Sequence, residues 1–382
     1  MRPVLTTQEF LKLSAVLHYQ LSGDPINWRA VLGQVIPRRL PRDQEQLMLA
    51  SLRYLRAAYG ETRRRLGPAA VLHPIRVMAI LDRTMGDAPI PELMAALLHD
   101  KLEDIHASQF DPDRWQGLED RYHELLGQLP EDDSQRLNDH IVVHTKSSEE
   151  RYHTYLGRIL DRAQDAPELV RLKLADRLDN TFDLRVDLWD TSTAVDGFQQ
   201  VFEVLFATRA QLETVDSPHH VPGKINGAHR LYQLSKNAVF LSMLRRAELD
   251  RVDPATEKLF RALCSASVEE SMRILVHLFN YHVRGRPEQL QALMEVMRYT
   301  QGGAIGMVTK GTEPDDLDGL FRDRFDADNK PQLERQLTEL YGDKAMMAKV
   351  AAAFGAIFCS FRNDPGYRIR GIDESGFHTL GD

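Results

Sequence analysis

Apolar residues recur along this chain with the spacing of amphipathic helices, and no stretch alternates polar and apolar side chains as a half-buried strand does. Helices are expected over 43–59, 73–81, 93–104, 149–160, 168–184, 229–248, 255–283, 286–299, 314–325 and 331–360. Of the 382 residues, 43% are hydrophobic and 27% are charged, which is the composition of an ordinary globular protein with ample material for a core. We therefore predict an all-α fold.

A stretch rich in proline and glycine, 215–228, is the best candidate for a boundary between two helical domains. It separates a central helical domain (46–215) from a C-terminal helical domain (216–382), and an N-terminal helical extension (1–45) precedes the central domain. The length is sufficient for this division. The tail from Asn363 is rich in glycine and charge, so we expect it to be loose.

The C-terminal domain contains no motif that indicates a chemical function. His219 and His220 have no further ligand at a useful spacing. The glycines at 302, 303 and 306 follow no predicted strand, so they do not form a dinucleotide-binding turn. A regulatory or dimerisation role remains as the expectation, and these helices are the candidate contact for a homo-oligomer.

Charge and cysteine content limit the partners and the compartment. A net charge of −8 argues against broad nucleic-acid binding. Cys264 and Cys359 are the two cysteines, and they do not form a CxxC motif, which favours a reducing compartment. The N-terminus lacks the apolar run of a signal peptide, and no run approaches the roughly 20 apolar residues of a membrane span. We expect a cytoplasmic protein without a membrane partner.

One face of the expected helix over 93–104 is unusually polar. The residues that fall within one arc of about 140° are His99, Asp100, Glu103 and Asp104. The apolar residues expected to face the core from the opposite side are Met94, Leu98, Leu102 and Ile105. Three acids on one face repel one another unless a cation neutralises them or water screens them.

Two further residues turn this acidic face into a candidate metal site. His73 lies upstream, and Asp176 lies on the later helix over 168–184. Together with His99 and Asp100 they offer two imidazole nitrogens and two carboxylate oxygens. This mixed set suits a first-row divalent ion such as Mn²⁺, Fe²⁺ or Zn²⁺.

The segment 54–184 also resembles a known family in several motifs. These are Ala58-Tyr59-Gly60 with the arginines at 63–65, His73-Pro74-Ile75, the run from Ala95 to Asp100 with Glu103-Asp104, His144-Thr145-Lys146, and the run from Lys173 to Leu178 with Asn180. They look like those of HD-domain hydrolases, and within these of the (p)ppGpp hydrolase domain of RelA/SpoT-type and small alarmone hydrolases. The resemblance implies a helical HD-domain bundle. It does not extend to a (p)ppGpp synthetase pattern in the rest of the chain.

The resemblance implies a role for each matching residue. The implied ligands of a manganese ion are His73, His99, Asp100 and Asp176. Glu103 and Asp104 match the acidic pair that activates or orients the attacking water, and this agrees with their position one helical turn from the ligands. Arg64 and Arg65 match basic residues that contact phosphate and purine, and Asn180 matches a residue that contacts ribose or phosphate. The implied reaction removes the 3′-pyrophosphate of (p)ppGpp, the alarmone of the stringent response.

Two departures from the family pattern bear on the substrate. Ala69-Ala70 stands where the family has Pro-Tyr, and Leu178-Asp179-Asn180 stands where it has Leu-His-Asn. We expect the charge of Asp179 to oppose a polyphosphate. Two alternatives therefore stay open: an HD phosphohydrolase that acts on another nucleotide or phosphate ester, and a nucleotide sensor without catalysis.

Overall fold

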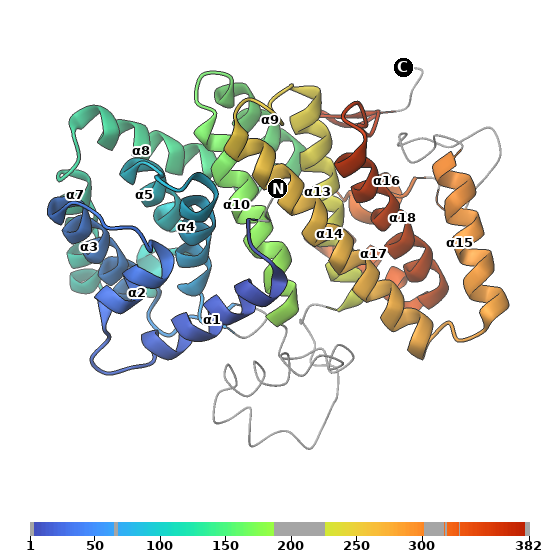
Figure 1. The fold of residues 1–382 in the computed structure, drawn as a ribbon, viewed down its shortest axis with the longest axis horizontal. Coiled ribbons are helices and arrows are strands. Elements are labelled where there is room, and N and C mark those ends of the chain that lie inside the picture. Colours follow the sequence, from blue (N-terminus) through green and yellow to red (C-terminus); the bar gives the residue numbers. More distant parts are fainter. Residues whose placement is uncertain are drawn as a thin grey trace. The chain divides into compact units, whose positions relative to one another are not determined.

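The computed structural model describes residues 4–64, 68–186, 226–301, 317, 319–327 and 329–378. The described chain is mostly helical, which confirms the all-α prediction (Figure 1). It divides into two compact units. The described part of unit 1 lies within 4–148 and 165–186, and that of unit 2 within 149–164 and 226–378. The expected boundary at 215–216 lies outside the described residues.

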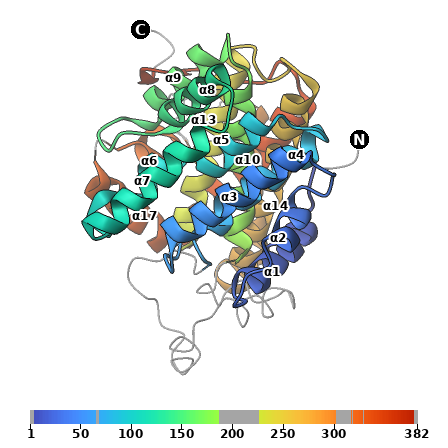
Figure 2. The same cartoon turned by 90° about the vertical axis from the view of Figure 1, so that its left-hand side faces the viewer.

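Unit 1 is a bundle organised around one buried helix. Its helices are α1 (Thr7–Leu21), α2 (Trp28–Val35), α3 (Arg42–Tyr59), α4 (Leu72–Met85), α5 (Ile90–Leu98), α6 (Lys101–Asp104), α7 (Pro112–Leu126), α8 (Glu131–His144) and α10 (Glu168–Asp183), with short 3₁₀ turns η1 (Ala107–Gln109) and η2 (Leu184–Val186). The central helix is α4, which packs against α5 and α10 and is buried along nearly its whole length. Helix α3 packs against α7, and Figure 2 shows these two helices running side by side.

The helix expected over 93–104 is interrupted, and this prediction of one continuous helix was wrong. Helix α5 ends at Leu98, and the short α6 begins at Lys101. Asp100, with φ −92° and ψ 5°, leaves the helical conformation and changes the direction of the chain. Leu102, expected in the core, is therefore 40% exposed, whereas the side chain of Lys101 is buried.

Unit 2 is also helical and has a core built on two long helices. Its elements are α9 (Tyr152–Ala163), α13 (Gly227–Arg246), α14 (Pro254–Tyr281), α15 (Arg286–Gln301), α16 (Arg322–Phe325), α17 (Lys330–Gly342), α18 (Lys344–Asn363) and the strands β1 (Ile372–Asp373) and β2 (Gly376–Phe377). The core lies where α14 packs against α18. By length and composition α18 is apolar enough to cross a membrane, but 67% of its most apolar window is buried, as in a core helix.

Two further expectations for unit 2 were wrong. The helix expected over 331–360 is two helices, because Asp343 leaves the helical conformation and its side chain accepts a hydrogen bond from the backbone N–H of Met346, which starts α18. The described part of the tail after Asn363, residues 364–378, is folded rather than loose. There β1 pairs with β2 in antiparallel register, and Ile369 and Ile372 are buried.

Candidate metal centre

Three helical segments of unit 1 bring the four predicted ligands together. His73 lies in the first turn of α4, Asp176 lies in the middle of α10, and His99 and Asp100 occupy the break between α5 and α6. Among the described residues, His73, His99 and Asp176 form a buried group whose candidate ligand atoms all lie within 4.8 Å of one another. The Asp100 carboxylate completes it, with oxygens 3.3 Å from His73 Nε2 and 3.1 Å from His99 Nε2.

Two consecutive residues contribute to the cluster at the end of α5. His99 has the helical φ −57° and ψ −35°, and Asp100, with φ −92° and ψ 5°, ends the helix. Their side chains meet, because Oδ1 of Asp100 lies 3.1 Å from Nε2 of His99. The interruption alters the path of the residues after Asp100 and leaves the expected proximity of His99 and Asp100 intact.

The Nδ1 atoms of the two imidazoles are engaged, which leaves both Nε2 atoms facing the cluster. His73 Nδ1 lies 2.6 Å from Asp179 Oδ2, and His99 Nδ1 lies 2.9 Å from the carbonyl oxygen of Ala96. Both partners only accept, so each Nδ1 donates. The Nε2 atom of His99 is buried and forms no well-aligned hydrogen bond within the part of the chain that the structure describes, although Asp100 Oδ1 lies 3.1 Å away. A metal ion would satisfy this atom, since metal-bound histidines typically donate their other N–H to such an acceptor.

The carboxylate of Asp176 is oriented by its neighbours on α10. Lys173 Nζ donates to Oδ2 at 2.8 Å, and the amide of Asn180 donates to Oδ1. Oδ1 also lies 3.3 Å from His73 Nε2 and 3.9 Å from His99 Nε2, so it faces the imidazoles. This oxygen is therefore the ligand atom that Asp176 offers.

The acidic pair lies beside the cluster rather than within it. Glu103 accepts a hydrogen bond from the backbone N–H of Lys146, and Asp104 accepts one from the hydroxyl of Tyr59 at 3.0 Å. Burial, followed by the charge of Asp100, raises the pKa of Asp104. The pKa of Glu103 is raised for the same two reasons. Both carboxylates are thus stronger proton acceptors than an ordinary surface acid.

The charges of the neighbouring groups favour a cation within the cluster. Burial opposes ionisation of both Asp100 and Asp176. At Asp100 the imidazoles of His99 and His73 outweigh it and lower the pKa of the carboxyl. At Asp176 the charge of Lys173, followed by the same imidazoles, outweighs it and lowers the pKa well below the usual range. Burial likewise opposes a charged His73, but three surrounding carboxylates raise its pKa well above the usual range. In the absence of metal, a proton on His73 therefore supplies the cation that these acids require.

Arg64 also reaches this region, and it contacts three residues of α10. Its Nη2 donates to Asn180 Oδ1 at 2.6 Å, its Nε lies 3.4 Å from Asp183, and its Nη1 lies 3.7 Å from Asp179. Nη1 is buried and forms no hydrogen bond within the described ranges. The second basic candidate, Arg65, lies outside the described residues.

Sequence reasoning missed the buried residues that contact a ligand on the side facing away from the cluster. Asp179 was expected to add charge that opposes a polyphosphate, but its carboxylate is fully buried and bonds to Arg76 and His73. Its charge is paired with Arg76 inside the protein, and its effect on a bound polyphosphate stays a prediction. The helical spacing of Arg76 three residues after His73, and of Asp179 three residues after Asp176, was the available signal.

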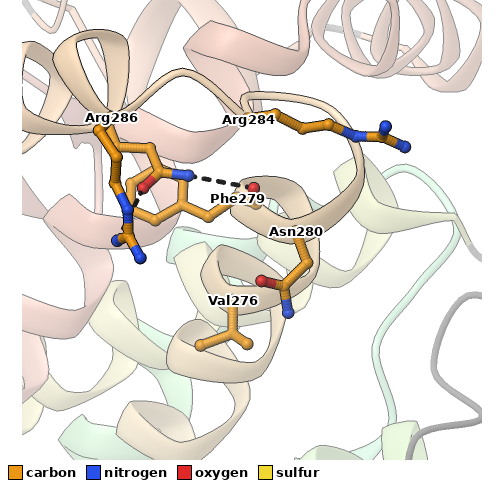
Figure 3. Close-up of a pocket in the computed structure, with 6 residues that line it drawn as sticks. Val276, Phe279, Asn280, Arg284 and Arg286 are labelled. Carbon is orange, nitrogen blue, oxygen red and sulfur yellow. Dashed lines mark hydrogen bonds between the residues drawn. The ribbon is translucent and has the colours of Figure 1, made fainter.

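Unit 2 contains a separate, open pocket of about 380 Å³ at the turn between α14 and α15. It is lined by Val276, Phe279, Asn280, Arg284, Arg286 and Gln289. Figure 3 shows the two arginine side chains pointing in different directions. The amide of Gln289 donates to the carbonyl oxygens of Phe279 and Val283, so it is already used for structure. Among the described residues, the lining offers no carboxylate, imidazole or thiol for catalysis.

The candidate metal centre of unit 1 therefore combines two imidazoles and two carboxylates. Nitrogen and oxygen donors in this combination suit a first-row divalent metal. Comparison with known proteins adds no relative, because no protein-family model and no curated protein matches the chain.

Proposed function

We propose that this protein is an HD-type, metal-dependent phosphohydrolase that removes the 3′-pyrophosphate from (p)ppGpp or a related alarmone nucleotide. The observation that supports this best is the buried pair of Nε2 atoms, of His73 and His99, that face the carboxylates of Asp100 and Asp176. The sequence resemblance supplies the substrate class, and Mn²⁺ is the metal it implies.

The ligands proposed for the metal are His73, His99, Asp100 and Asp176. When bound there, a divalent ion would lower the pKa of a coordinated water and polarise a phosphoryl group. Glu103 or Asp104 would accept the proton of that water, since both lie within one turn of Asp100 and have a raised pKa. Neither acid is needed to hold the metal, which leaves both free for proton transfer.

Arg64 and Asn180 are the proposed contacts of the substrate phosphates. The guanidinium of Arg64 is partly exposed, and its Nη1 has no hydrogen-bond partner in the described part of the chain. Such a planar group can bind two phosphate oxygens at once. Asn180 bonds to both Arg64 and Asp176, so it links the phosphate contact to the metal ligands. Arg65 is proposed as the contact beside the purine.

The test is pyrophosphate release by the purified, Mn²⁺-loaded protein from ppGpp, pppGpp and ppApp, with a nucleoside monophosphate and a cyclic nucleotide as comparison substrates. We expect release from at least one alarmone, and its loss in His99→Ala or after EDTA. His123→Ala is the matched control, because His123 is an exposed histidine of α7 away from the site.

Three other outcomes would contradict the proposal in different ways. Turnover of only the comparison substrates would indicate a different HD phosphohydrolase. Tight nucleotide binding without turnover, at full metal occupancy, would indicate a sensor. Activity that survives both His99→Ala and EDTA would exclude the metal centre itself.

A further inference from the structure

The metal ligand His73 is supported by a buried acid from another helix. Asp179 lies on α10 and is fully buried, and its Oδ2 lies 2.6 Å from Nδ1 of His73 on α4. This is the shortest described contact of the His73 side chain, and it lies on the side of the ring opposite to the ligand cluster.

A second buried residue keeps this acid in place. Arg76 follows His73 by one helical turn, and none of its side chain is exposed. Its guanidinium donates to both oxygens of Asp179, from Nε at 2.8 Å and from Nη2 at 3.0 Å. The same Nη2 donates to Asp183 Oδ1 at 2.8 Å, and the ring of Phe10 lies 4.7 Å from the guanidinium. A buried carboxylate needs such a paired cation, because burial of an uncompensated charge is costly.

We propose that Asp179 is a positioning residue for the metal centre: it accepts the Nδ1–H of His73, fixes the orientation of the ring and so presents Nε2 to the divalent ion. An acceptor at Nδ1 selects the tautomer and makes Nε2 a better ligand. Arg76 holds Asp179 in the position that this requires. This inference depends on one part of the proposed function, namely that the site binds a metal.

Asp183 provides a matched comparison within the same network. Like Asp179 it is a buried acid of α10 that accepts from Arg76, but none of its described contacts is with His73. Loss of either carboxylate removes one partner of Arg76. A difference in Mn²⁺ affinity between the two variants therefore measures the effect of the contact with His73, and not a general loss of stability.

The experiment measures Mn²⁺ affinity by isothermal titration calorimetry for the full-length wild type, Asp179→Ala and Asp183→Ala. Alanine is used because an asparagine oxygen could still accept from Nδ1 of His73. We expect the dissociation constant of Asp179→Ala to rise by about 10- to 100-fold, the range found for such supporting residues. Asp183→Ala should stay within about threefold of the wild type, because the acceptor of His73 is retained. Where turnover is found, excess Mn²⁺ should restore kcat in Asp179→Ala.

Equal losses of affinity in both variants, or none in either, would overturn the proposal. A wild type that binds no Mn²⁺ would overturn it together with the proposed function. Mn²⁺ binding without turnover of any nucleotide would refute the proposed function alone, and the comparison of Asp179 with Asp183 would still decide this inference.

A second measurement uses the wild type, in case Asp179→Ala does not fold. In the ¹⁵N-resolved histidine spectrum of the Zn²⁺-loaded protein, His73 should bind metal through Nε2 and keep its proton on Nδ1. Metal bound through Nδ1, or an Nδ1 without a proton, would contradict the proposed role of Asp179.

Discussion

His144 is a buried residue whose titration should affect stability. Its Nδ1 lies 2.9 Å from the carbonyl oxygen of His140, and its Nε2 lies 3.1 Å from that of Leu169. Burial, followed by the charge of Lys173, lowers the pKa of His144 to about 3. In the unfolded chain a histidine titrates near 6.5. Protonation therefore favours the unfolded state, so the stability due to His144 is fully present above pH 6.5 and is lost as the pH falls.

We predict that the free energy of unfolding falls by about 2 kcal/mol more in the wild type than in His144→Gln between pH 6.5 and 5.0, since each unit of difference in pKa is worth about 1.4 kcal/mol. Urea denaturation at a series of pH values measures this difference, with the exposed His123→Gln as the control. Equal pH dependence in the wild type and His144→Gln would show that the two carbonyl oxygens stabilise the protonated ring.

Lys101 anchors the residue next to the ligand Asp100. Its Nζ donates to Glu119 at 2.9 Å and lies 4.2 Å from the centre of the Tyr122 ring. Both partners are on α7, so this buried lysine fixes the start of α6 to a different helix.

We predict that Lys101→Met destabilises the protein by about 1–3 kcal/mol, because it leaves the partly buried carboxylate of Glu119 without its cation. Urea denaturation measures the loss, and the exposed Lys12→Met serves as the control. A cost no larger than that of Lys12→Met would contradict this account of Lys101.

At the scale of single residues, the candidate metal ligands were easier to predict than the residues that hold them in place. The side chains of His73, His99 and Asp176 are metal donors by chemical type, and their expected proximity is confirmed. The role of Asp179 could not be predicted, because it depends on the side of the His73 ring that each carboxylate approaches. The roles of Glu103, Asp104, Arg64 and Asn180 stay predictions.

At the scale of elements, helix type was easier to predict than helix ends. The apolar spacing over 93–104 and over 331–360 continues across a break in each case, at Asp100 and at Asp343. Periodicity detects which face is apolar and not whether the backbone is continuous. At position 343 the signal of a helix end was an aspartate that caps the next helix. The turn at Asp100 has no such capping bond.

The first turn of α14 depends on one capping side chain, which gives a prediction at this scale. Asp253 accepts hydrogen bonds from the backbone N–H groups of Ala255 and Thr256, at 2.8 and 2.9 Å. We expect Asp253→Ala to cost about 1–2 kcal/mol of stability, and Asp253→Asn to cost less because an amide oxygen also caps. Thermal or urea denaturation measures both. Equal losses would show that capping by Asp253 is not the cause.

At the scale of the whole molecule, the division into units was the least predictable feature. Residues 149–164 were expected in the central domain, yet α9 belongs to unit 2. There His153 packs against the ring of Phe377, and Thr154 donates to the carbonyl oxygen of Glu374. These contacts join residues more than 200 positions apart in the sequence, and no local sequence pattern predicts contacts over such a distance along the chain.

Because every proposed ligand lies in unit 1, metal should stabilise the two units differently. At a free Mn²⁺ concentration of 100 times the dissociation constant, we predict about 2.7 kcal/mol of added protection for α4 and α10, and none for α14 and α18. Amide hydrogen exchange followed by mass spectrometry resolves these helices, and EDTA should reverse the effect. Unchanged exchange in α4 and α10 would contradict a metal site between them.

The buried network around Arg76 also constrains how this sequence can change over time. Two acids share one guanidinium that has no access to water, and loss of a partner from such a group typically costs about 3–5 kcal/mol. Neutral replacement of both Asp179 and Asp183 at once is therefore compatible only with an uncharged residue at 76. In an alignment of descendants of this sequence, the three positions should covary, and a lineage that loses Arg76 should lose both acids with it.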